Sequence, residues 1–169
     1  MSPDEESRQL TQATKLTLIG VFLGLLAAFT ARQASRGEDV QISPFDLLLL
    51  GLTTYRAGHL IAYERVAEPV RAPLTETVPD RSGVGETVVA SGRGVRYALG
   101  ELVSCPICVG TWAAAGLVYG LHLAPRPTRV FLAVMSTTGL AELLHCSTEA
   151  ASWVGRAARA LSGSHGERD

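Results

Sequence analysis

Two cysteines, Cys105 and Cys108, are separated by a proline and an isoleucine where a polar segment gives way to an apolar run. Proline suits the first position of a helix because its missing N–H would have no partner there. The spacing therefore predicts a helix that begins at Pro106, with Cys105 as its N-cap. In that position the Cys105 sulfur can accept a hydrogen bond from the Cys108 backbone N–H, and the helix dipole favours the thiolate.

Three interpretations of this CPxC motif stay open. A zinc or iron site would combine Cys105 and Cys108 with ligands from His145 and Cys146, because zinc sites pair CxxC with later His or Cys residues. Adjacent residues on a helix do not share a face, so both later ligands can bind only if the helix has ended by His145. A redox dithiol would use Cys105 and Cys108 alone, although no strand pattern precedes them as it does in thioredoxin-like proteins. In the structural interpretation, the sulfur side chains pack at a helix start.

The composition is typical of a small integral membrane protein. The chain has 169 residues, of which 47% are hydrophobic and 18% are charged, and its mean hydropathy is +0.21. Soluble domains usually carry about 25% charged residues. The net charge of −1 gives no basic face for nucleic acid. Three cysteines do not form a secreted disulfide framework.

The apolar residues fall into four blocks, which predict an all-α, polytopic four-helix transmembrane bundle. The predicted spans are residues 16–31, 45–63, 107–123 and 130–145. The polar segments around them are a disordered lead at 1–15, a connection at 64–104 that ends in a short amphipathic helix, and a tail at 147–169.

Polar side chains interrupt two of these spans. Arg56 and His59 lie on one face of the second span, and Glu142 lies near the end of the fourth. A charge inside a membrane is costly unless it has a partner. We therefore expect these residues to face the interior of the bundle, with Arg56 and Glu142 as an ion pair.

The distribution of basic residues predicts the orientation of the spans, because cytoplasmic segments are enriched in Lys and Arg. Ten of these residues fall on the side that holds both termini and the 64–104 connection, and four fall on the other. The ten are Arg8, Lys15, Arg65, Arg71, Arg81, Arg93, Arg96, Arg156, Arg159 and Arg168, and the four are Arg32, Arg36, Arg126 and Arg129. The predicted topology in a bacterial inner membrane is N-in and C-in, with the CPxC motif on the cytoplasmic face.

Small residues recur at helical spacing in the third predicted span. Gly116 and Gly120 form a GxxxG pair, and Gly110 with Ala114 forms another small-xxx-small pair. Such faces let helices approach closely, so self-association or binding of a protein partner is one interpretation. The abundance of Gly and Ala in any membrane helix is the other. The lipid bilayer is the partner that the composition itself predicts.

Four short patterns resemble a bacterial membrane family, the family of domain of unknown function 1360, which includes a sporulation-associated membrane protein of bacilli. They are Thr-Tyr55-Arg56, Pro69-Val-Arg71-Ala-Pro73, Cys105-Pro-Ile-Cys108-Val-Gly-Thr-Trp112 and Gly139-Leu-Ala-Glu-Leu-Leu-His145. The resemblance covers residues 45–145 and leaves out the first predicted span and the tail. It implies a membrane architecture and carries over no activity.

Taken together, these patterns predict a membrane scaffold or partner-binding protein that is not an enzyme, with a CPxC site that is structural or binds a metal. The alternative is a membrane thiol–disulfide oxidoreductase that uses Cys105 and Cys108.

Overall fold

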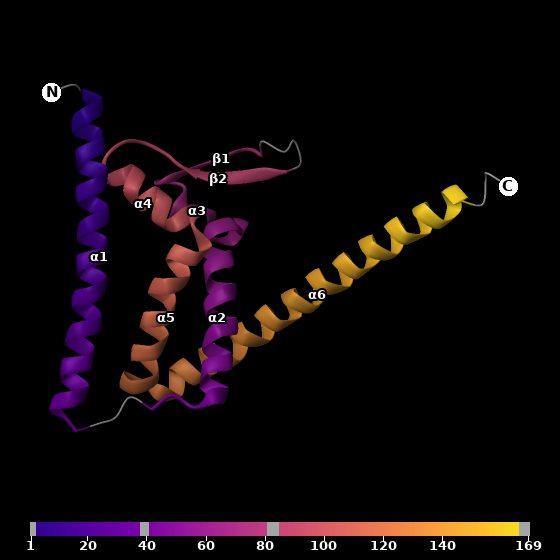
Figure 1. The fold of residues 1–169 in the computed structure, drawn as a ribbon. Helices are drawn as coiled ribbons and strands as arrows, with labels where there is room; N and C mark the ends of the chain where they lie inside the picture. Colours follow the sequence, from indigo (N-terminus) through magenta and orange to yellow (C-terminus); the bar gives the residue numbers. More distant parts are fainter. Residues whose placement is uncertain (1–2, 38–40, 81–84, 166–169) are drawn as a thin grey trace.

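The computed structural model describes residues 3–37, 41–80 and 85–165. Three helices, α1, α2 and α5, run side by side, and the long helix α6 crosses α2 and leaves the group (Figure 1). A hairpin and short helices lie at the end that also holds the start of α1 (Figure 1). In chain order the elements are α1 (Pro3–Ser35), α2 (Pro44–Tyr63), η1 (Arg65–Ala67), α3 (Glu68–Arg71), β1 (Thr75–Pro79), β2 (Glu86–Ala90), α4 (Val95–Ser104), α5 (Pro106–Leu123) and α6 (Pro125–His165).

Helix α2 is the centre of the packing, because it contacts both α5 and α6. It begins at Pro44, and the Ser43 hydroxyl caps it by accepting a hydrogen bond from the Asp46 N–H at 3.0 Å. Apart from Leu50, its buried residues are small, and the Thr53 hydroxyl donates to the Leu132 carbonyl of α6 at 3.3 Å. Gly58 is placed so that an added Cβ would collide with the Pro106 carbonyl oxygen. Close approach of α2 and α5 therefore depends on a glycine at this position.

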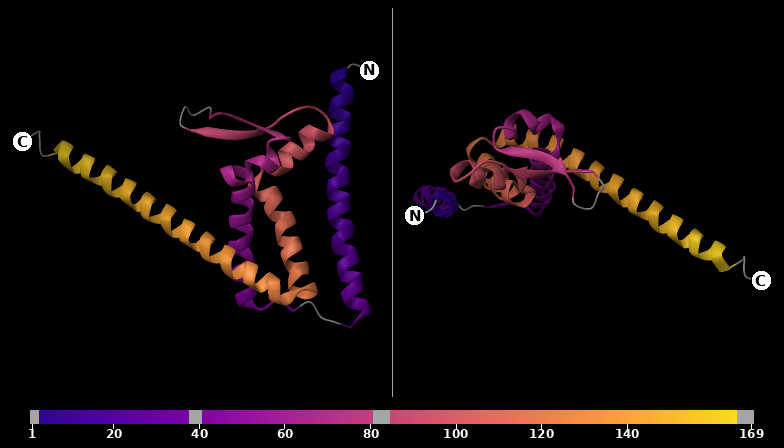
Figure 2. Two further views of the ribbon diagram at one scale, coloured as in Figure 1. Left: turned by 180° about the vertical axis from the view of Figure 1, so that it is seen from behind. Right: turned by 90° about the horizontal axis from the view of Figure 1, so that it is seen from above.

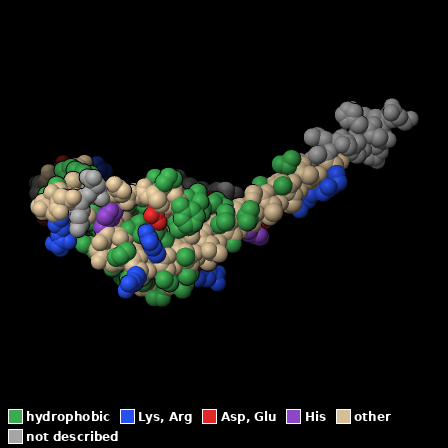
Figure 3. All heavy atoms as spheres, turned by 90° about the horizontal axis from the view of Figure 1, so that it is seen from below, with side chains coloured by type: hydrophobic (Ala, Val, Ile, Leu, Met, Phe, Trp, Pro, Cys, Tyr) green, Lys and Arg blue, Asp and Glu red, His purple; other side chains and the backbone are tan. Residues whose placement is uncertain are grey.

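Three helices in the described part of the chain are long and apolar enough to cross a membrane: Pro3–Ser35, Pro106–Leu123 and Pro125–Arg156. Helix α2 is not among them, because Asp46, Arg56 and His59 make its sequence more polar. The predicted four-helix transmembrane bundle is therefore not confirmed, whereas a mostly helical fold with apolar helices suited to a bilayer is. Hydrophobic side chains cover much of the surface seen from below and continue along α6 (Figure 3).

The prediction of a disordered lead is wrong from Pro3 onward, while residues 1 and 2 lie outside the described part. Helix α1 begins at Pro3, and Asp4, Glu5 and Glu6 occupy its first turn. Carboxylates there interact favourably with the helix dipole. The less exposed positions of α1 follow one face at intervals of three or four residues: Ser7, Thr11, Thr14, Leu18, Phe22, Leu26, Phe29 and Gln33. This face rests against α4 and α5, and seen from above α1 stands at the edge of the group (Figure 2).

The 64–104 connection contains strands that the all-α prediction missed. Strands β1 and β2 pair antiparallel, with Thr75 opposite Ala90 and Pro79 opposite Glu86. Alternating Thr and Val residues favour this pairing, although the prolines and glycines nearby masked the signal. The predicted short amphipathic helix is confirmed as α4, which packs on β2.

Helix α6 continues without a break from Pro125 to His165. The predicted fourth span and the tail up to His165 are therefore one helix, while residues 166–169 lie outside the described part. No proline follows Pro127 to end the helix. Its far end projects away from the other helices (Figure 1).

Candidate functional site

The CPxC motif forms the corner between α4 and α5. Helix α4 ends at Ser104, Cys105 has an extended backbone, and α5 begins at Pro106. The Cys108 backbone N–H donates a hydrogen bond to the Cys105 sulfur, with an N–S distance of 3.3 Å. The prediction that Cys105 caps this helix is therefore confirmed.

Both thiols of the motif are free. The pKa of the Cys105 thiol is lowered chiefly because the Cys108 thiol donates a hydrogen bond to it. The backbone N–H groups of Ile107 and Cys108 lower this pKa further, against an opposing effect of burial. A thiolate at Cys105 is thus stabilised by the start of α5.

The predicted metal cluster does not form. Within the described residues, no group of three or more His, Cys, Asp or Glu side chains lies close enough together to hold a metal ion. His145 and Cys146 are exposed on α6. Helix α6 lies against α2 at Gly139, which is next to Leu52 and Arg56, and its far part then projects away from the other helices (Figure 1). The sequence predicted that the four ligands lie at a similar depth in the membrane. Residues at one depth can still belong to helices that do not touch.

The predicted pairing of Arg56 with Glu142 is present, with the two side chains 3.5 Å apart. Arg56 also donates a hydrogen bond to Glu64, a partner that the sequence did not reveal. Glu64 follows the last residue of α2, so it reaches back along the same helix. His59 lies between two tyrosine rings of α2, with centroid distances of 4.5 Å to Tyr55 and 5.6 Å to Tyr63. Of these contacts, the Arg56–Glu142 pair joins α2 to α6, and the others lie within α2 or at its end.

Arg71 is a second polar residue with an unforeseen role. Its side chain is only 4% exposed, and it donates hydrogen bonds to the backbone carbonyls of Ile61, Tyr63 and Glu64. The last carbonyls of a helix have no partners within the helix. Arg71 supplies those partners for α2. A sequence signal existed in the prolines around Arg71, which turn the chain back toward this helix end.

The small-residue pairs of α5 divide into two groups. Gly110 lies against Thr54 of α2, and Gly120 lies against Thr128 of α6. An added Cβ on Gly116 would meet nothing within 4 Å. Two of these glycines therefore serve contacts within the chain, and Gly116 is open on the surface.

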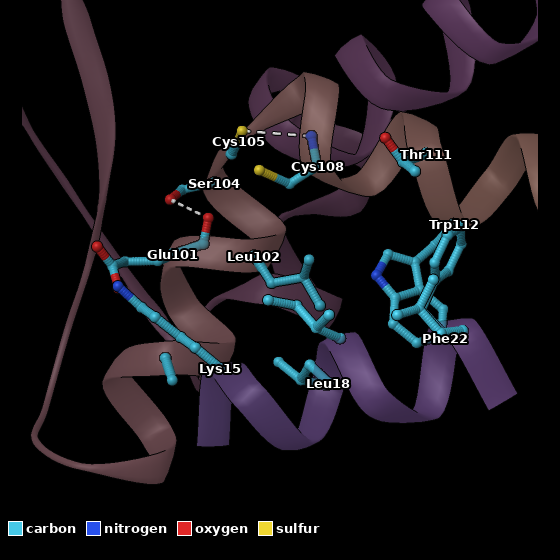
Figure 4. A pocket seen from close by; sticks show the side chains of 13 residues that line it. Lys15, Leu18, Phe22, Glu101, Leu102, Ser104, Cys105, Cys108, Thr111 and Trp112 are labelled. Carbon is cyan, nitrogen blue, oxygen red and sulfur yellow. Dashed lines mark hydrogen bonds and ion pairs between the residues drawn. The ribbon is translucent and has the colours of Figure 1, made fainter. Parts of the chain in front are cut away.

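An apolar cleft of about 680 Å³ lies beside the CPxC motif, between α1 and the corner formed by α4 and α5 (Figure 4). Lys15 and Glu101 form an ion pair across one end, at 2.6 Å. Phe22 and Trp112 meet edge to face farther along, with ring centroids 5.1 Å apart. The cleft was not predicted, because it depends on where α1 docks.

Cys105 and Cys108 both line this cleft, together with Ser104 and Thr111 (Figure 4). The cleft surface is otherwise mostly apolar, with Leu18, Ile19, Leu23, Ala98 and Leu102 among its residues. The arrangement places a nucleophilic sulfur at the edge of an apolar slot.

A family model described as "Protein of unknown function (DUF1360)" matches residues 49–148. The chain is 29% identical over 106 residues to Sporulation protein YjcA of Bacillus subtilis (strain 168), and the match covers 61% of this chain and 90% of that protein. It is 25% identical over 107 residues to UPF0713 protein YngL of the same organism, covering 62% of this chain and 78% of the relative. No solved structure matches the chain.

Proposed function

Because this chain belongs to the DUF1360 family of proteins of unknown function, whose matched residues 49–148 include α5 and most of α2, we propose that it is a bacterial inner-membrane scaffold or partner-binding protein. One observation carries this proposal: the side chains that could do chemistry are instead used to hold the helices in place. Cys105 caps α5, Arg71 caps α2, and Arg56 joins α2 to α6. Groups engaged in this way support the fold, so the CPxC motif is assigned a structural role.

The proposal includes four membrane crossings with both termini in the cytoplasm. The 20 residues of α2 would span about 30 Å, which matches the hydrocarbon core of a bilayer. Its polar residues would be tolerated because α5, α6 and the ion pairs surround them. The start of α1, the hairpin and α4 lie at one end of the helices, which agrees with the excess of basic residues assigned to that side (Figure 1).

Exposed apolar residues supply the surface for lipid and partner contact. Large hydrophobic side chains on three helices remain exposed, including Leu16 at 69%, Ile107 at 81% and Val130 at 65%. An exposed apolar surface of this extent marks a membrane or protein interface.

The second candidate is a thiol–disulfide oxidoreductase, and the lowered pKa of Cys105 favours it. Redox dithiols need one cysteine that is a thiolate near neutral pH. In this mechanism the Cys105 thiolate would attack a disulfide sulfur of a substrate, and Cys108 would then resolve the mixed disulfide. The substrate disulfide would be reduced to two thiols while Cys105 and Cys108 became oxidised to a disulfide.

Substitution of Cys105 separates the two candidates. Serine is a good helix cap and alanine is a poor one. If the role is structural, Cys105→Ser keeps the melting temperature of the detergent-purified chain, and Cys105→Ala lowers stability by about 1 kcal/mol, or roughly 2–4 °C. Cys146→Ala, which changes an exposed cysteine on α6, is the control and should have no effect.

The pH dependence of alkylation provides the second measurement. Iodoacetamide reacts with the thiolate, so the lowered pKa predicts that Cys105 reaches half its maximal rate at a lower pH than free N-acetylcysteine in the same buffers. A reversible Cys105–Cys108 disulfide in glutathione buffers, together with equal melting temperatures for the Ser and Ala variants, would favour the oxidoreductase and reject the structural role.

A further inference from the structure

The cleft beside the CPxC motif continues into a polar pocket along the same seam. This second pocket, of about 370 Å³, lies between the first turns of α1 and the start of α4, and Lys15 lines both cavities. One cavity is apolar and the next is basic. The two cavities adjoin at Lys15, and we treat them as the two halves of one groove along α1 and α4.

We propose that this groove binds one anionic phospholipid, with an acyl chain in the apolar cleft and the phosphate in the basic pocket. The inference rests on the membrane location in the proposed function. It adds a ligand, a binding site and the residues that select that ligand.

The apolar part has the shape and chemistry of a slot for an acyl chain. It extends along α1 from Lys15 to Leu23, which is about 12 Å at the rise of an α-helix. Leu18 of α1 faces Leu102 of α4 across it (Figure 4). Ile19 and Leu23 are 56% and 57% exposed, so the slot opens to the surroundings of α1.

The polar pocket is lined by basic side chains. Arg8 and Arg93 line it, and neither forms an ion pair with another described residue. Among the described residues, no aspartate or glutamate lines this pocket. Lys15 is neutralised by Glu101, so the excess charge belongs to the two arginines. Arginine binds phosphate oxygens through a planar, bidentate fork.

The position of the pocket along α1 also fits a lipid headgroup. Helix α1 is polar up to Lys15 and apolar from Leu16 onward. In the proposed orientation, Arg8 and Arg93 lie on the cytoplasmic side, where basic residues attract anionic lipids. The groove changes from basic to apolar at Lys15, as a phospholipid changes from headgroup to acyl chain. A bound peptide or a second copy of the chain would not need this change to fall at the membrane surface.

Fluorescence of Trp112 provides a direct test, because its ring lines the cleft. A Trp153→Phe background leaves Trp112 as the chain's remaining tryptophan. The full chain is reconstituted into phosphatidylcholine bilayers that contain increasing amounts of phosphatidylglycerol with brominated acyl chains, which quench tryptophan on contact. Half-maximal quenching is expected at a mole fraction about tenfold lower than with brominated phosphatidylcholine.

Two double variants with equal charge isolate the site. Arg8→Gln with Arg93→Gln should remove the preference for phosphatidylglycerol. Arg65→Gln with Arg159→Gln removes the same charge from exposed positions on the same predicted membrane side that line neither cavity, and the preference should remain. All four arginines are exposed, so neither double variant disturbs the core.

Equal quenching by the two lipids in the Trp153→Phe chain, with all its arginines unchanged, would overturn the inference. Loss of the preference in both double variants would also overturn it, because the effect would then come from general surface charge. If soluble glycerol phosphate binds the purified chain while brominated phosphatidylglycerol quenches Trp112 no better than brominated phosphatidylcholine, the pocket holds a free phosphate and the lipid is rejected. Flotation of the chain with liposomes tests the proposed membrane location separately. A chain that floats with the liposomes but shows no preference for phosphatidylglycerol contradicts the lipid site alone.

Discussion

The helices of this protein meet along two seams that are built differently. In the core seam, which joins α2 to α5 and α6, small residues such as Gly58, Thr53 and Ala57 bring the backbones together. In the α1 seam, which joins α1 to α4 and α5, large rings make the contacts, including Phe29 stacked on Tyr119 at 4.3 Å. Large side chains touch at separate points and leave the apolar cleft between them.

The difference between the two seams coincides with the boundary of the family match. Residues 49–148 include the core seam, whereas α1 lies outside the match. In the core seam Arg56 pairs with Glu142, and Arg71 donates hydrogen bonds to carbonyls at the end of α2, so these polar groups are used in packing. The α1 seam leaves room for a ligand. We infer that the family core provides the stable frame and that α1 adds a binding surface.

The largest predicted effect is at the closest contact of the core seam. Gly58→Leu would force α2 away from the Pro106 carbonyl and should cost about 3 kcal/mol, because overpacking displaces the backbone. Thermal unfolding in detergent measures this loss. Gly116→Leu is the matched control in α5, where an added Cβ meets nothing within 4 Å, and it should leave the melting temperature nearly unchanged. Equal losses at the two glycines would contradict the description of a tight core seam.

A smaller loss is expected when the end of α2 is left without its cap. Arg71→Met keeps most of the side-chain volume but leaves the carbonyls of Ile61, Tyr63 and Glu64 without the Arg71 donors, at a cost of about 2 kcal/mol. Thermal unfolding again provides the measurement. Arg65→Met removes an exposed arginine from the same connection and serves as the control. If the two variants have the same melting temperature, Arg71 does not stabilise the core seam.

The smallest effect should come from the α1 seam. Phe22→Ala removes the contact with Trp112 and should cost about 1 kcal/mol, within the range of an aromatic pair. The expected signs are a shift in Trp112 emission and a small change in melting temperature. Leu132→Ala, at a fully buried position of α6, should cost at least twice as much. A larger loss at Phe22 than at Leu132 would mean that α1 belongs to the core.

Features encoded by neighbouring residues were predictable. Cys105, Pro106 and Cys108 specify a capped helix start, and the structure has this cap. The Arg56–Glu142 pair was also predicted, because an isolated charge in an apolar helix needs a partner. The strands were missed because each has only five residues, and a pattern that short is weak beside prolines and glycines.

Contacts between distant elements were decided by the tertiary structure. The predicted metal ligands shared a depth, but α6 crosses α2 and leaves His145 and Cys146 exposed. The Lys15–Glu101 pair and the cleft beside Cys105 depend on where α1 docks. The residue pattern of α1 does not predict that position.

The sequence by itself therefore determined the apolar stretches of the helices and the cap at Cys105, because these follow from hydrogen bonding and burial within a few turns. Only the tertiary structure decided which helix faces meet. A helix face can pack against several partners, and the choice depends on crossing geometry and on small residues such as Gly58 and Gly139 at the crossing points.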